Sequence, residues 1–230
     1  MKRFWQDVVV EERDGGHAIL LDERVVKTPL HGELILPNEA LANAVLAEWA
    51  GVGEEVDPAT MPMTGFANAA IDKVASERAT FVDTIAAYGE ADLFCYRAEN
   101  PRPLVDRQDE QWGKWLRWAQ AHYSLSFTVI SGIIHQPQPE DTVARLKEAV
   151  EELSDWQLAA ASKLAHISGS LVAMLALVDE EASAAVIWPD LILDELWQEE
   201  HWGADEFALK NRQDREVEFM DAARFMTMCR

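Results

Sequence analysis

Cysteine is scarce in this sequence of 230 residues, where only Cys95 and Cys229 are present. Two cysteines cannot build a disulfide framework, and without a CxxC pair they do not indicate a structural zinc site. This usage is typical of a reducing compartment. The first residues show neither an apolar run before a small-residue cleavage site nor an arginine-rich, acid-poor leader. We therefore expect a cytoplasmic protein, for which the mitochondrial matrix would be the equivalent in a processed eukaryotic form.

Basic residues are also few, since 20 Lys and Arg stand against 41 Asp and Glu, a net charge of −21. Such a charge opposes contact with many phosphate groups, so nucleic-acid binding and attachment to anionic membranes are not expected. An uninterrupted apolar run of membrane-spanning length is missing as well. The most apolar stretch, 155–178, contains Lys163, His166 and Ser168-Gly169-Ser170. We expect it to form one long buried helix and no membrane span.

The motifs of common enzyme classes are absent. The chain has no GxxxxGK[ST] loop, no GxGxxG and no GxSxG. His166 and Ser168 do not suggest a base and a nucleophile, because residues two apart on a helix point away from each other. Glu199-Glu200-His201 does not match HExxH, and neighbouring residues on one helix do not converge on one ion. We expect no catalytic residue, no metal, no cofactor and no small-molecule substrate.

The first third of the chain has the pattern of short strands. Residues 4–36 alternate apolar runs with turn signals such as Asp14-Gly15-Gly16, which predicts a small antiparallel sheet of hairpins. Asn38 is a suitable cap for a helix over about 39–50. Glycines and prolines in 51–63 suggest a connector. The sequence thus predicts an α+β protein with a β-rich domain at 1–62 carrying one helix, followed by a larger, mainly α-helical domain at 63–230.

Helical periodicity dominates the second part. Apolar residues recur every three to four positions in about 104–123, including Trp112 and Trp115, and again after Pro139. Ser154 with Gln157 forms a capping-box pattern. Pro189 stands where a helix ending near 202 would begin. A last helix is expected from about 205 to the C-terminus. Nine tryptophans are many for this length, and although most should fill the core, an exposed one would indicate an interface.

Negative charge is concentrated in 151–206, which holds thirteen acidic residues and one basic residue, Lys163. The helix before Trp202 is the densest part. Acidic residues in its first turn complement the helix dipole, but those near its end do not. At 100° per residue Glu200 would project into the apolar arc of this helix, where a carboxylate needs a partner. Acidic residues that do not stabilise their own helix are compatible with a solvated helix face. They are equally compatible with a surface that receives Arg or Lys from a partner.

Several stretches resemble, in order, the assembly chaperones that bind the α subunit of ATP synthase before its catalytic head is built. They are Lys27-Thr28-Pro29, Glu48-Trp49, 57–64 with 67–72, Tyr88 to Ala98, Gly169-Ser170-Leu171 and the Asp194 to Glu206 stretch DELWQEEHWGADE. Each is weak alone, and together they are specific. The resemblance implies a β-rich N-terminal domain, a larger helical domain and no catalytic activity.

The resemblance also implies transient binding of the free α subunit, which would prevent its aggregation until it pairs with the β subunit. In that family an acidic position in the C-terminal helical region matters for function, and Glu195, Glu199 and Glu206 are matching candidates here. With the acidic surface, this gives a predicted partner-binding set: Glu195, Glu199, Glu200, Trp202, Asp205 and Glu206. A chaperone that acts by covering a surface of its client needs no nucleotide-binding loop. A modest, charged interface would suit release of the client.

Two other hypotheses remain open at this stage. The chain could be an uncharacterised small-molecule enzyme with an acidic cleft between its two domains, in which burial would raise the pKa of Glu200 and make it a general acid. It could also be a permanent subunit of a larger complex. A shallow surface around Glu200 would count against the enzyme hypothesis, and gel filtration of native extract would separate a permanent subunit from a transient chaperone.

Overall fold

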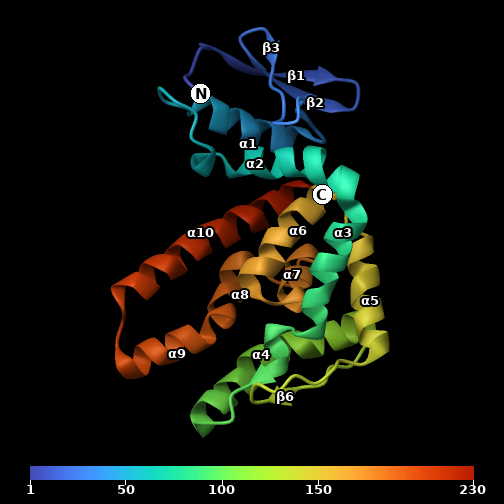
Figure 1. The fold of residues 1–230 in the computed structure, drawn as a ribbon, viewed down its shortest axis with the longest axis vertical. Helices are drawn as coiled ribbons and strands as arrows, with labels where there is room; N and C mark the ends of the chain where they lie inside the picture. The colour runs from blue at the N-terminus through green and yellow to red at the C-terminus, as the bar shows by residue number, and fades with distance from the viewer. The chain divides into compact units, whose positions relative to one another are not determined.

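The computed structural model describes residues 1–230, and it opens with a small antiparallel sheet (Figure 1). Strands β1 (Val8–Arg13) and β2 (Gly16–Leu21) form a hairpin in the register Val8↔Leu21 to Arg13↔Gly16. β2 also pairs with β3 (Arg24–Val25) and β4 (Ile35–Leu36). Gly15 and Gly16 both have positive φ at the turn, a conformation that side chains disfavour. The predicted sheet of hairpins is confirmed.

Helix α1 (Glu39–Ala50) packs on β1 and β2. Asn38 begins it as predicted, because its Oδ1 accepts a hydrogen bond from the Leu41 backbone N–H at 2.9 Å. Leu41, Val45 and Trp49 lie on its buried face. A polar contact then ties the next segment to α1, since the Glu48 carboxylate accepts hydrogen bonds from the N–H of residues 63 and 64 at 2.7 and 2.8 Å. The segment 51–63 is thus anchored at its C-terminal end.

The remaining chain is mostly helical, as predicted for the larger part of an α+β protein (Figure 1). Its first elements are η1 (Pro58–Thr60), α2 (Pro62–Ala69), the π-helical turn η2 (Ala70–Val74) and α3 (Ala75–Ala86). These are followed by η3 (Ala87–Glu90), η4 (Leu93–Cys95), β5 (Tyr96–Arg97), α4 (Arg102–Tyr123), β6 (Ile130–Ser131) and α5 (Glu140–Glu151). The last are α6 (Asp155–Ser168), α7 (Leu171–Val178), α8 (Ala184–Leu191), α9 (Leu193–Trp202) and α10 (Glu206–Met228).

The predicted single helix over 155–178 is wrong, because it is broken between α6 and α7. Gly169 adopts φ +63, which ends α6, and Ser170 begins α7 by accepting a hydrogen bond from the Ala173 N–H at 3.0 Å. The small polar residues that argued against a membrane span are therefore a helix junction. No helix in the structure combines the length and the apolar character that crossing a bilayer requires.

The predicted start of a helix at Pro189 is also wrong. Pro189 lies inside α8, and the break falls at Ile192, where φ is −104 and ψ is 18. Because α8 has only eight residues, Pro189 interrupts few helical hydrogen bonds. The chain turns here instead, and α9 starts with Asp194 and Glu195 in its first turn, where negative charge is favourable.

Contacts divide the chain into two compact units. The first contains 1–81, 153–160 and 224–230, and the second contains 82–152 and 161–223. The first is built on the sheet, α1 and α2. The core of the second includes α7, whose residues 171–177 are all buried and which packs against α4. The division into independent domains at 62/63 stays a prediction.

Candidate functional site: the acidic α9–α10 hairpin

All six residues predicted to bind a partner lie on one helical hairpin of the second unit. α9 ends at Gly203, which has φ +85, and α10 begins two residues later. Asp205 accepts a hydrogen bond from the Ala208 N–H at 2.8 Å, so this acidic residue serves as the cap of α10. Figure 1 shows α9 and α10 running side by side from this turn. The six residues chosen from the sequence thus lie on one continuous part of the structure.

Two ion pairs hold the hairpin closed. Glu195 contacts Arg215 at 2.5 Å, and Glu199 contacts Arg212 at 2.6 Å. The Arg212 side chain is only 15% exposed. Dissolved ions therefore screen this ion pair less than they screen a pair on an open surface. The two glutamates, four residues apart, would repel each other in an isolated helix, and these arginines offset that repulsion. The negative charge of Glu195 and Glu199 thus has a local structural role that could not be recognised from the sequence.

Glu200 has the partner that its carboxylate was expected to need. It is exposed and makes a bidentate contact with Arg107 of α4, at 2.8 and 2.9 Å. A half-exposed carboxylate paired with arginine is not the buried acid that the enzyme hypothesis requires.

The turn between the helices presents apolar groups to solvent. We call residues 202–207 the hairpin tip. Trp202 is 77% exposed and Phe207 is 83% exposed, while Glu206 is exposed beside them. Behind Trp202, a shallow hollow of about 190 Å³ is lined by α9 and α10. An exposed tryptophan and phenylalanine next to carboxylates form a surface suited to an apolar, basic partner.

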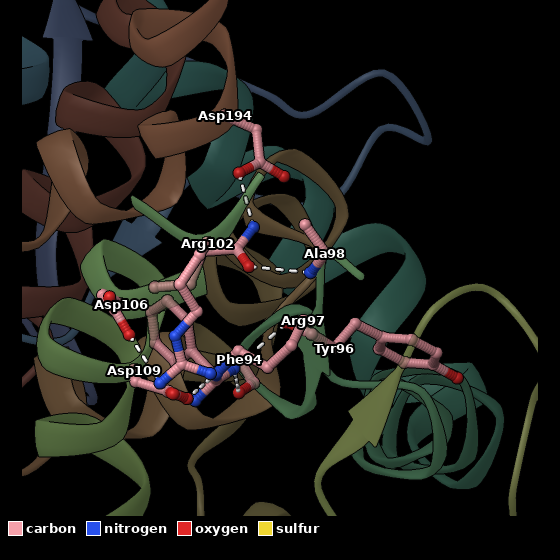
Figure 2. A network of polar contacts seen from close by, with 9 residues as sticks. Phe94, Tyr96, Arg97, Ala98, Arg102, Asp106, Asp109 and Asp194 are labelled. Atoms are coloured by element: carbon pink, nitrogen blue, oxygen red, sulfur yellow. Dashed lines mark hydrogen bonds and ion pairs between the residues drawn. The ribbon is translucent and has the colours of Figure 1, made fainter. Parts of the chain in front are cut away.

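A polar network in the second unit fixes the start of α9 (Figure 2). The Gln108 amide donates a hydrogen bond to the Asp194 carboxylate at 2.7 Å and accepts one from the Ala98 N–H at 2.8 Å. Next to it, the buried Arg97 guanidinium contacts Asp109 at 2.7 Å. Both Ala98 and Asp194 belong to the motif stretches of the sequence, but only the fold shows that Gln108 connects them.

The tryptophans of α4 anchor the end of α8. The indole N–H of Trp112 donates to the Asp190 carbonyl, and that of Trp115 donates to the Asp190 carboxylate, both at 2.7 Å. Lys114 contacts the same buried carboxylate at 2.7 Å. This role of Asp190 could not be predicted from the sequence, because no local pattern signals it. These two tryptophans are core residues, whereas Trp202 is the exposed one.

A second buried carboxylate, Asp92, joins η4 to α7. It accepts hydrogen bonds from the N–H of Phe94 and of Val172, both at 2.9 Å, and from the Ser170 hydroxyl at 2.8 Å. Burial raises the pKa of Asp92 to about 6, against the lowering effect of these hydrogen bonds. The motif stretches around Asp92 and Gly169-Ser170-Leu171 are thus held together by one side chain.

The other candidate groups do not form a reactive site. His166 contacts the Tyr88 hydroxyl at 3.4 Å, while the Ser168 hydroxyl donates to the Ser170 carbonyl at 3.1 Å. Cys95 is buried, and burial raises the pKa of its thiol further from the reactive thiolate form. No group of three or more His, Cys, Asp or Glu side chains is arranged to hold a metal ion.

Comparison with known proteins identifies close relatives of this fold. The family described as "ATP12 chaperone protein" matches residues 2–120. The crystal structure of Atp12 from Paracoccus denitrificans is 36% identical, with a TM-score of 0.95 over 100% of this chain and 98% of that one. An aspartate-to-lysine mutant of P. denitrificans Atp12p gives the same values. The mitochondrial protein atp12 of Schizosaccharomyces pombe is 23% identical over 227 residues, covering 90% of this chain and 75% of that protein.

The similarity extends over the sheet and the helices alike, and the family match includes more than half of the chain. The sequence motifs, the hairpin and the fold lead to one assignment. This chain belongs to the ATP12 chaperone family.

Proposed function

We propose that this protein is an ATP-independent assembly chaperone that binds the free α subunit of ATP synthase and prevents its aggregation until it pairs with the β subunit. Membership of the ATP12 chaperone family carries the proposal, because the similarity covers the whole chain at 36% identity. We further propose that binding is transient, takes place in the cytoplasm of a bacterial cell, and requires neither a cofactor nor a chemical step.

The proposed contact surface is the hairpin tip. Trp202 and Phe207 expose large apolar areas whose burial against a client would favour binding, and aromatic side chains often dominate such interfaces. Glu206 is exposed and has no side-chain partner in the hairpin, so it would be free to receive a basic group. A contact confined to the hairpin tip would be modest in area, which suits a chaperone that must release its client.

The remaining acidic residues of the predicted set would act differently. Glu195, Glu199 and Glu200 each contact an arginine, and in the proposed mechanism they hold α9 in position rather than reach the client first. Asp205 shapes the turn as the cap of α10. Glu199→Lys would place a lysine beside Arg212 and loosen the hairpin, so a loss of binding in that variant would not distinguish a contact from a structural role.

The test uses light scattering of isolated α subunit, without nucleotide, in the presence of stoichiometric protein. Wild type should suppress aggregation. Trp202→Ser combined with Phe207→Ser should weaken the apparent affinity on the order of tenfold or more, because two exposed aromatic anchors are lost. The control is Val186→Ser with Val217→Ser, two smaller side chains that are 57% and 61% exposed in α8 and in the part of α10 beyond the hairpin tip. The control should behave as wild type.

Charge is tested separately with Glu206→Lys, compared with Glu181→Lys, an exposed glutamate in the turn before α8. We expect Glu206→Lys to reduce suppression while Glu181→Lys does not, with unchanged circular dichroism and melting curves in both. Equal aggregation with and without the wild-type protein would refute the chaperone proposal. Equal loss in both charge variants would instead show that only the total charge matters and would remove the hairpin tip as the site.

A further inference from the structure

The loop between α4 and α5 exposes its own apolar residues. Ile133 is 95% exposed, Ile134 is 78% exposed and Val129 is 50% exposed. We call residues 129–134 the isoleucine loop. Its position is defined by the backbone, because β6 pairs in parallel with β5 and the Gly132 N–H donates to the Arg97 carbonyl at 2.9 Å. Two neighbouring isoleucines held almost fully in water are unfavourable unless another surface covers them.

Carboxylates line two grooves near this loop. A groove of about 380 Å³ is lined by Gly132 and Ile133 together with Glu99, Asp194 and Arg97, which is paired with Asp109. The Glu99 carboxylate lies beside the loop, since its Oε1 is 3.0 Å from the point that a side chain at Gly132 would occupy. Another groove, of about 390 Å³, is lined by Glu90, His135 and Glu140 among others. The isoleucine loop therefore lies near several carboxylates.

The backbone of the loop also offers an open edge. The small sheet consists of β5 and β6 alone, so β6 has a neighbour on one side only. In a parallel pair, alternate residues direct their N–H and C=O to the same neighbour, and Gly132 faces β5. The exposed Ser131 accordingly directs its backbone groups away from β5. An extended segment could pair with these groups while covering the isoleucines.

We propose that the isoleucine loop is a second docking surface for the client, and that it receives an apolar segment of the free ATP synthase α subunit flanked by Lys or Arg. This inference rests on the proposed function and adds a site outside the α9–α10 hairpin. Charge complementarity selects this occupant. The groove lined by Ile133 holds Glu99 and Asp194, and its one cation, Arg97, is already paired with Asp109. The groove that begins at His135 adds Glu90 and Glu140, so the carboxylates near the loop match basic groups in a partner.

The same charges disfavour the other occupants. A second copy of this chain would bring identical carboxylates against each other, and the whole protein carries −21. An anionic lipid surface would be repelled for the same reason. An apolar segment with basic neighbours is the partner that removes the isoleucines from water and finds opposite charge in the grooves near them.

The experiment measures binding of the full-length protein to immobilised, isolated α subunit by biolayer interferometry. Ile133→Ser combined with Ile134→Ser should raise the apparent Kd on the order of tenfold, because the apolar contact is lost while every charge is kept. Val186→Ser with Val217→Ser removes a smaller exposed apolar area away from the isoleucine loop and should stay close to wild type. Since both isoleucines are exposed, melting temperatures should not change, and Ile133→Ser alone serves as a milder variant.

The outcomes separate this inference from the function on which it rests. If wild type does not bind the α subunit at all, the proposed function fails and the docking surface fails with it. If wild type binds and the isoleucine variant binds equally well, only the docking surface is refuted. If sedimentation shows that wild type self-associates and the isoleucine variant does not, a second copy is the occupant and the proposal is overturned.

Discussion

At the scale of single residues, two buried carboxylates connect elements of the second unit. They differ in how far their negative charge is compensated. Asp190 has Lys114 beside it at 2.7 Å, so its charge is compensated. Asp92 is fully buried and receives hydrogen bonds from neutral donors only, namely Phe94, Ser170 and Val172. Neutral donors compensate an ionised carboxylate less well than a cation does, so desolvation dominates and raises the pKa of Asp92 to about 6.

This raised pKa predicts a pH dependence of stability. The folded protein binds the Asp92 proton more tightly than the unfolded chain, whose pKa is near 3.8. The associated stability is fully present below about pH 4 and is lost as pH rises through about 6. A pKa near 6 instead of 3.8 corresponds to roughly 3 kcal/mol by pH 7.

Asp92→Asn removes this ionisation and isolates the effect. Urea unfolding of both proteins at about pH 4.5 and pH 7 gives the free energies of unfolding. The difference, wild type minus variant, should decrease toward pH 7. The variant will be less stable in absolute terms because an amide cannot accept from all three donors, but that loss is similar at both pH values. A difference that stays constant or increases with pH would contradict the prediction.

At the scale of elements, the sequence predicted what local signals specify. The hairpin sheet, the Asn38 cap of α1 and the Ser154–Gln157 capping box all appear, the last with hydrogen bonds of 2.9 and 3.2 Å. Each depends on residues close in sequence. The errors at Gly169 and Pro189 have another cause, because apolar periodicity continues through both helix breaks and hides them.

The junction of α6 and α7 gives a prediction at this scale. A Cβ at position 169 would meet nothing within 4 Å, so Gly169→Ala would be penalised only by its backbone φ of +63. We expect a loss of about 1–2 kcal/mol in the free energy of unfolding, measured by urea titration. The control is Gly65→Ala inside α2, where a Cβ also meets nothing and φ is not positive. That change should stabilise the protein by about 0.5–1 kcal/mol.

If both alanine variants changed stability in the same direction, the left-handed conformation at Gly169 could not be the reason for the α6–α7 break. The two glycines have equally open surroundings, so only the backbone conformation separates them. The comparison therefore tests directly why one apolar stretch forms two helices.

At the scale of the whole molecule, the sequence located the candidate site but not its internal contacts. The acidic pattern directed attention to the α9–α10 hairpin, and Trp202 proved to be exposed. The arginines that neutralise Glu195, Glu199 and Glu200 lie 13 to 93 residues away in the chain. Only the fold brings such residues together. The docking role of the hairpin stays a proposal that the binding experiments test.

The net charge of −21 leads to a prediction for the complete protein. If the client presents basic groups, long-range attraction should accelerate association, and salt should screen it. We expect the association rate constant with isolated α subunit to fall on the order of tenfold between about 50 mM and 500 mM NaCl, while the dissociation rate changes less. Biolayer interferometry across this range provides both constants.

The Trp202→Ser and Phe207→Ser double variant is the matched comparison for the salt series, because it removes apolar contact and keeps the charge. Its association rate should show the same salt dependence as wild type, while its dissociation rate should be faster at every concentration. An association rate of wild type that is unaffected by salt would mean that the negative surface does not guide the client. The acidic composition would then act on solubility alone.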